Sequence, residues 1–90
     1  MSSNLIGEIA GNLGTYIVNN ATEVTKTIDA IVVLEDTIFS SIKVEGADVK
    51  ATYIADTATA VKAGAIITPV NDLQFSGVQL VSGSIALVLG

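Results

Sequence analysis

The chain has 90 residues, no cysteine and no histidine, and a formal net charge of −5. This length fits a single domain over residues 1–90, which buries only roughly 60 to 65% of the surface of its unfolded chain. Disulfides, thiolate metal sites and imidazole ligands are excluded, so oligomerisation is the remaining way to add stability. The four lysines and the absence of arginine argue against a basic patch for nucleic acid or an anionic membrane surface.

The balance of apolar and charged residues points to a further packing surface. Half of the residues are apolar and 14% are charged, against about 25% in average soluble domains. With so few charges, we expect part of the apolar surface to face another subunit. The longest apolar runs, 30–34 and 85–89, are far shorter than the roughly 20 residues of a membrane-spanning helix. The first residues also lack the pattern of a signal peptide, so we expect a soluble, non-secreted chain.

The N-terminal part predicts an arm followed by a strand. Residues 4–9 form a short strand or an extended arm that ends at the glycine-rich turn 10–14, so residues 1–14 are a possible N-terminal arm. Thr15–Val18 combines β-branched and aromatic residues, which favours a strand, and Asn19-Asn20 provides its turn. We expect the segment from Asn4 to Ile17 to be the arm that contacts a partner.

The middle of the chain predicts further strands. From 21 to 34, Val24, Ile28 and Ile31 also fit helical spacing, but three threonines and the lack of a good cap favour a strand. Residues 31–34 and 37–44 are strands on either side of Glu35-Asp36. The turn 45–48 then leads into a hairpin, for which Val49–Ile54 is the next candidate strand.

The C-terminal residues 65–90 predict a meander of three short strands. Pro69 marks a strand end because it cannot donate to a ladder, and Asn71-Asp72 completes the turn beside it. This stretch also repeats an earlier one: residues 30–32 and 39–44 recur, in the same order, as 65–67 and 75–80. Phe39 and Phe75 hold corresponding positions in this near-repeat, which favours them as paired core anchors. The unreactive final strand is typical of a surface kept for packing, within the subunit or against the next one.

Turn signals at roughly ten-residue spacing and about eight short strands are typical of an all-β domain. We therefore predict a small antiparallel β-sandwich or jelly-roll-like barrel with an extended N-terminal segment.

Reactive chemistry is poorly represented in this sequence. Glu35-Asp36 and Asn71-Asp72 would form a calcium-type site if the fold brought them together, but neither has the spacing of a dedicated loop. A carboxylate pair for glycoside hydrolysis would also need a groove lined by aromatics, and the four aromatics suit a core better. The serines at 40, 41, 82 and 84 have no general base. The sequence predicts no catalytic residue, no metal site and no cofactor.

Three segments, Ala30–Ile42, Ala63–Ile67 and Phe75–Ala86, resemble small virion proteins of tailed bacteriophages. These include capsid decoration, head-spike and head-fibre components, and the likeness covers about residues 28–90. The resemblance implies an all-β fold, symmetric assembly and no catalytic residues. The short chain leaves no room for a separate receptor-binding domain, which favours a capsid-surface or connector role.

We therefore expect a decoration or cement subunit, assembled in the host cytoplasm and located on the phage head. Its expected partners are its own copies, with a trimer favoured, and the major capsid protein or another virion protein. The expected interface residues are Leu5, Ile6, Ile9, Tyr16, Phe39 and Phe75.

Two alternatives remain open: a receptor- or glycan-contacting module of a spike or tail fibre, and a self-assembling filament or shell subunit. A decoration subunit should bury all four aromatics, so the exposure of Tyr16 and Tyr53 distinguishes it from a receptor-contacting module.

Overall fold

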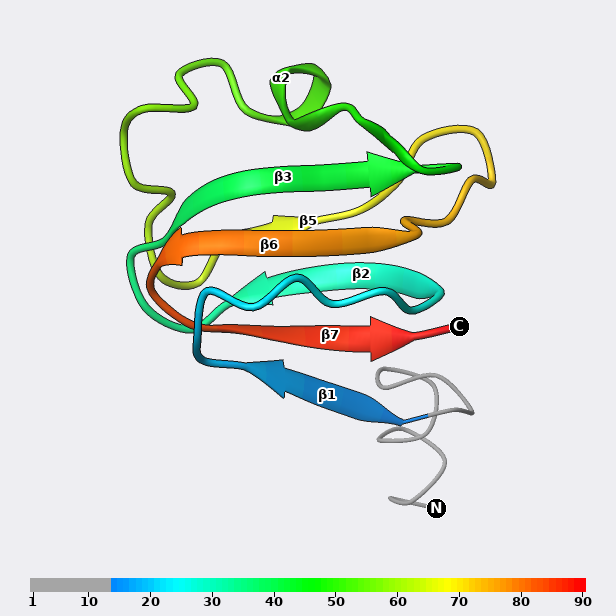
Figure 1. The fold of residues 1–90 in the computed structure, drawn as a ribbon, viewed down its shortest axis with the longest axis horizontal. Helices are drawn as coiled ribbons and strands as arrows, with labels where there is room; N and C mark the ends of the chain where they lie inside the picture. Colours follow the sequence, from blue (N-terminus) through cyan, green and yellow to red (C-terminus); the bar gives the residue numbers. More distant parts are fainter. Residues whose placement is uncertain (1–13) are drawn as a thin grey trace.

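The computed structural model describes residues 14–90, which fold into two antiparallel sheets that pack face to face (Figure 1). Sheet A has the order β1-β7-β2-β5, and sheet B has the order β4-β3-β6. The strands are β1 (Thr15–Val18), β2 (Ile28–Val33), β3 (Ile38–Val44), β4 (Ala47–Asp48), β5 (Ile66–Ile67), β6 (Gly77–Ser82) and β7 (Ile85–Leu89). One four-residue helix, α2 (Lys50–Tyr53), lies outside the sheets. The predicted all-β sandwich is confirmed, whereas the predicted arm and strand at 4–9 lie outside the described residues.

The core lies between the two sheets and forms because alternate strand residues point to one face. In β2, for example, Ile31 and Val33 are buried while the intervening Val32 is partly exposed. Both phenylalanines belong to this core, with Phe39 at 3% and Phe75 at 0% exposure, which confirms their prediction as core anchors. The other buried members of the cluster are Val18, Ile28, Ile31, Val33, Ile42, Ile67, Val78, Leu80, Ile85 and Leu87.

The predicted meander at 65–90 is wrong. β5 and β7 belong to sheet A and flank β2, while β6 belongs to sheet B and pairs with β3. From β5 to β6 and again from β6 to β7 the chain therefore crosses between the sheets, because each of these strands pairs with a strand far away in the sequence. The turns themselves are where the sequence predicts them: Asn71 and Asp72 have φ values of 54° and 60°, just after Pro69.

The predicted strand at 49–54 is also wrong, since its centre forms α2. The predicted hairpin does exist, but its returning strand is only Ala47–Asp48, which pairs with Val44 and Lys43. The side-chain carboxylate of Asp48 accepts a hydrogen bond from the backbone N–H of Lys50, two residues later, at 3.0 Å. This local bond turns the backbone away from the sheet and ends the ladder.

The stretch before β2 is not a continuous strand. Of residues 21–27, only Val24 pairs with a strand, through a bridge to Val78 in β6. A second bridge joins Ile28 to Phe75, so the two sheets are linked along one side of the sandwich. The domain is thus a partly closed sandwich, which fits the predicted barrel-like variant.

Candidate assembly surfaces

The predicted interface residues lie in three different settings. Leu5, Ile6 and Ile9 lie outside the described residues. Phe39 and Phe75 are buried within one subunit, so their side chains leave almost nothing for a partner to contact. Tyr16 is 42% exposed on β1. Of the six, Tyr16 alone is described in a position where a partner can reach it.

The main candidate surface is the face of sheet A that points away from the core, here called the outer face. Residues directly opposite in an antiparallel ladder share a face. The pairs Ile17↔Ala86, Val32↔Ala86 and Val32↔Ile66 therefore place one row of four apolar side chains across all four strands. The pairs Thr15↔Val88 and Ala30↔Val88 add a second row on the same face. The outer face thus carries no charged residue in either row.

The exposure of the outer face depends on the position in the sheet. Ile17 and Ile66, on the two marginal strands, are 51% and 66% exposed, whereas Ala86 and Val88 in the interior strand β7 are each 9% exposed. The exposed apolar area of this row therefore lies mainly at its two ends, at Ile17 and Ile66.

The sequence of β7 contains the signal for this surface. Its five residues, Ile85–Leu89, are all apolar, with no alternation between apolar and polar positions. Such a run is typical of a strand covered on both faces. Ile85 and Leu87 belong to the core cluster on one of these faces, whereas Ala86 and Val88 on the other face are each 9% exposed. The apolar run alone predicts a packing surface, but its neighbours Ile17, Val32 and Ile66 follow only from the order of the strands in the sheet.

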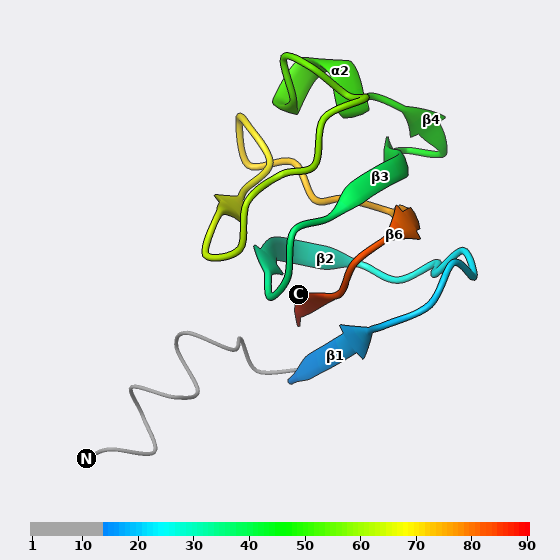
Figure 2. The same cartoon turned by 90° about the vertical axis from the view of Figure 1, so that its left-hand side faces the viewer.

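The margin of sheet A at β1 is the second candidate surface. Within the described residues, β1 pairs only with β7, and it lies at the margin of the domain (Figure 2). The N–H of Leu89 donates to the carbonyl of Gly14 at 2.9 Å, which makes their pair a hydrogen-bonded one. Because such pairs alternate along an antiparallel ladder, Tyr16 and Val18 direct their backbone groups to β7. Thr15 and Ile17 therefore direct their N–H and C=O groups outward.

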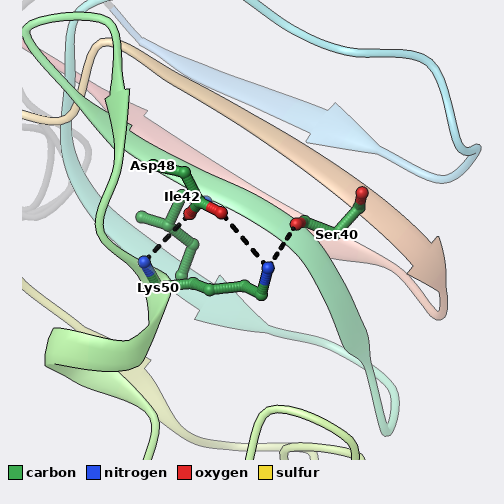
Figure 3. Close-up of polar contacts among 4 residues, drawn as sticks. All are labelled: Ser40, Ile42, Asp48 and Lys50. Carbon is green, nitrogen blue, oxygen red and sulfur yellow. Dashed lines mark hydrogen bonds and ion pairs between the residues drawn. The ribbon is translucent and has the colours of Figure 1, made fainter.

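The margin of sheet B at β3 is closed in a different way. Where β4 ends, side chains replace the missing strand: the carboxylate of Asp48 accepts the N–H of Ile42 at 3.2 Å, and the ammonium of Lys50 donates to the carbonyl of Ser40 at 2.9 Å (Figure 3). The same ammonium lies 3.2 Å from the Asp48 carboxylate. Charged side chains of this kind prevent another strand from pairing with an edge.

The two remaining margins are also restricted. β6 is partly covered because Val24 exchanges two backbone hydrogen bonds of 2.9 Å with Val78. β5 has only two residues and is followed by Pro69, and short or proline-flanked edges pair poorly with other chains. Among the described strands, β1 is therefore the one with a full-length, unprotected margin.

A polar hollow of about 340 Å³ lies beside β1, lined by residues 16–20 and 22–26. The ammonium of Lys26 lies 4.6 Å from the centre of the Tyr16 ring, in a cation–π contact. Glu23, in the same hollow, forms an ion pair with Lys43 of β3. The hollow thus offers an exposed aromatic ring next to charged and amide groups.

The acidic pairs considered for calcium are not brought together. Asp36 follows β2, where its carboxylate accepts the N–H of Ala63 at 3.0 Å, whereas Asn71-Asp72 belongs to the loop between β5 and β6 at the other end of the sheets (Figure 1). Within residues 14–90, no three acidic side chains cluster in a way that would hold a metal ion. The calcium alternative is therefore wrong for these two pairs.

The four serines considered as nucleophiles have structural surroundings. The hydroxyl of Ser84 donates to the carboxylate of Glu35 at 2.9 Å, and this bond joins the β6–β7 connection to the β2–β3 connection. The hydroxyl of Ser41 is buried without a hydrogen-bond partner among the described residues. Neither arrangement supplies the base and orienting group of a nucleophilic triad.

Comparisons with models of protein families, with characterised proteins and with solved structures found no match to this chain. In residues 14–90, no helix has the length and apolar character needed to cross a membrane. The fold and its surfaces therefore define the class as a small all-β domain with an uncharged outer sheet face that is exposed at both margins.

Proposed function

We propose that this chain is a non-enzymatic structural protein of a virion, a decoration or cement subunit that attaches to the surface of a phage head. The observation that supports it best is the uncharged outer face of sheet A, which spans four strands in a domain whose core is already complete. An uncharged face with exposed isoleucines at both margins is suited to packing against another protein.

The size of the outer face favours attachment together with other contacts. Four strands about 4.8 Å apart, each about four residues long at about 3.4 Å per residue, give a face of roughly 250 Å². A stable interface needs roughly 800 Å² from each partner. One outer face is therefore too small by itself, and a subunit that covers capsomer seams as a symmetric oligomer would combine several of them.

A capsid pelleting assay tests the proposal. The full chain is mixed with purified capsids of the virus that encodes it, and we expect it to sediment with them at a fixed ratio. Ile66→Asp places a charge on the outer face and should weaken capsid binding at least tenfold, whereas Ala51→Asp, at an exposed position of α2, should not. A chain that stays in the supernatant at all capsid concentrations would contradict the proposal.

Tyr16 favours a second candidate function, contact with a receptor glycan. We expected a decoration subunit to bury all four aromatics, and Tyr16 is 42% exposed beside the polar hollow, while Tyr53 is partly buried against Phe75. A sugar ring would stack on the Tyr16 ring, with Asn19 or Glu23 bonding its hydroxyl groups. Screening the chain and Tyr16→Ala on immobilised glycans tests this: binding that depends on Tyr16 would favour the second candidate.

Electron microscopy of the purified chain tests the third alternative. Regular filaments or shells formed without capsids would favour a self-assembling subunit. Particles of uniform small size would favour decoration.

A further inference from the structure

We infer that two copies of this chain pair through β1, antiparallel and across a two-fold axis at Tyr16. The pairing joins both copies of sheet A into one continuous eight-stranded sheet. This inference concerns the contact between copies and does not depend on a role in a virion.

The backbone of β1 is self-complementary. Its outward groups belong to Thr15 and Ile17, which flank Tyr16 symmetrically. An antiparallel partner centred on Tyr16 places each Thr15 opposite the Ile17 of the other copy. These are hydrogen-bonded pairs, which exchange both of their N–H···O bonds, so all four outward groups of each copy are satisfied. A register shifted by one residue would leave them facing groups that already bond to β7.

The side chains of β1 also suit this partner. Ile17 and Thr15 lie on the outer face, so the pairing places the isoleucine of one copy beside the threonine of the other. β-branched side chains opposite each other are favourable cross-strand pairs. The chain has a net charge of −5, yet Thr15–Val18 contains no charge that would repel its own copy.

Pairing at β1 would also enlarge the outer face of sheet A. The apolar rows of the two copies become continuous, and the uncharged surface grows from roughly 250 Å² to roughly 500 Å², by the same strand spacing. The other sheet margins are less open to a second copy than the margin at β1. The side chains of Asp48 and Lys50 occupy the margin at β3, and Val24 covers part of the margin at β6. The contact made by β1 alone is small, so we expect a reversible dimer that forms with increasing concentration.

A single cysteine tests the register. The chain has no cysteine, so Tyr16→Cys introduces one thiol per copy. On the two-fold axis the two thiols form a directly opposed, non-hydrogen-bonded pair, with Cβ atoms about 4.5 to 5.5 Å apart, near the separation that a disulfide needs. Under mild oxidation we expect covalent dimers to form at least tenfold faster than with Thr15→Cys, whose thiols lie on opposite sides of the axis. Equal rates for the two variants would overturn the inference.

Solution mass by light scattering provides the second readout. Across a concentration series the full chain should rise toward twice the 9.2 kDa of one chain. Thr15→Pro removes an outward N–H without removing a bond to β7, and it should lower the dimer fraction at least tenfold. Ile66→Lys changes the outer face at its far margin and should leave the dimer fraction within twofold. Circular dichroism confirms that each variant is folded.

The remaining outcomes are also decisive. A limiting mass of three chains would overturn the pairing and favour the trimer expected from the sequence. A monomer at all concentrations, together with no cross-linking of Tyr16→Cys, would overturn the pairing but leave capsid binding to its own assay. A dimer that Ile66→Lys abolishes and Thr15→Pro does not would show association through the outer face and overturn pairing at the edge.

Discussion

Ile42 and Val78 lie directly opposite each other in the β3–β6 ladder, and they hold corresponding positions in the two halves of the near-repeat. The neighbouring pairs follow the same relationship. In the near-repeat, Ser41 corresponds to Gly77 and Lys43 corresponds to Gln79. In the ladder, Ser41 pairs with Gln79 and Lys43 pairs with Gly77, so the two pairs are equivalent. The repeated segments therefore pair with each other rather than forming two separate units.

Sheet A shows the same relationship between its repeated segments. There, Ile31 corresponds to Ile66 and Val32 corresponds to Ile67. The observed pairs Ile31↔Ile67 and Val32↔Ile66 are therefore equivalent in the same way. Each pair of repeated strands is therefore related by a local two-fold exchange, centred in sheet B on the pair Ile42↔Val78.

Ile42 should be among the most sensitive positions of the core. It is 0% exposed, and truncation to alanine leaves a cavity opposite Val78 that neighbouring strands cannot close. We expect Ile42→Ala to lower the free energy of unfolding by about 2 to 5 kcal/mol, measured by denaturant titration. Ile66→Ala, at a 66% exposed position, should change it by less than about 0.5 kcal/mol. A loss below about 1 kcal/mol at Ile42 would contradict its place as a closely packed core residue.

Local sequence signals predicted the turns, most strands and the buried phenylalanines. Glu45 and Gly46, for example, have φ values of 52° and 83°, as the predicted turn before β4 requires. These features depend on residues close together in the chain. The sheet to which each strand belongs depends on distant partners, such as Ile31 with Leu87, and no local pattern specifies such pairs.

The candidate site was predicted only in part for the same reason. Tyr16 is accessible, as expected of an interface residue, but the outer face is assembled from strands that are adjacent only in space. Ile17, Val32 and Ile66 become neighbours through β7, which lies at the end of the chain. The helix at 50–53 was missed because the side chain of Asp48, rather than the propensity of the segment, ends the ladder.

Gly83, between β6 and β7, should not tolerate a side chain. Its φ is 97°, and a Cβ atom there would lie against the hydroxyl of Thr37 and 2.6 Å from the carbonyl oxygen of Asp36. Gly64 has a similar φ of 93° but has no atom within 4 Å of such a Cβ, so it provides a matched control. Replacement by alanine should cost about 1 kcal/mol at Gly64, from backbone strain alone, and at least about 2 kcal/mol more at Gly83.

Thermal unfolding of the two variants, compared with the parent chain, checks this expectation. The Gly83→Ala melting temperature should lie well below that of Gly64→Ala. Equal melting temperatures would mean that the Thr37 region relaxes freely around the added methyl group.

Tyr53 anchors α2 to the core through its ring and its hydroxyl. The ring packs edge-on against Phe75 with centroids 5.1 Å apart, and the hydroxyl accepts the N–H of Val70 at 3.2 Å. Tyr53→Phe retains the ring contact and should cost no more than about 1 kcal/mol. Tyr53→Ala should cost about 1 kcal/mol or more beyond that, because the aromatic pair and its buried area are both lost. Denaturant titration of both variants separates the two contributions, and equal losses would show that the ring contact contributes nothing.

Asp48 should make the fold sensitive to acid. Partial burial alone would raise the pKa of its carboxyl, but hydrogen bonds from the N–H groups of Lys50 and Ile42, together with the Lys50 ammonium, outweigh it and hold that pKa below its ordinary value of 3.8. A carboxyl whose pKa is lower in the folded state stabilises the fold above its unfolded pKa. That stabilisation is lost as the pH falls through the folded pKa.

Asp48→Asn keeps the shape of the side chain and removes its charge. The variant should therefore be less stable than the parent at pH 7, and the difference should shrink as the pH falls below about 4. Both chains should still lose stability in acid, because hydrogen bonds from Ala63 and Thr59 lower the pKa values of Asp36 and Asp56 respectively. Denaturant titrations between pH 2 and pH 7 measure this, with Asp72→Asn in an exposed turn as the control. A stability difference for Asp48→Asn that is the same at every pH would show that its charge does not contribute to closing the β3 edge.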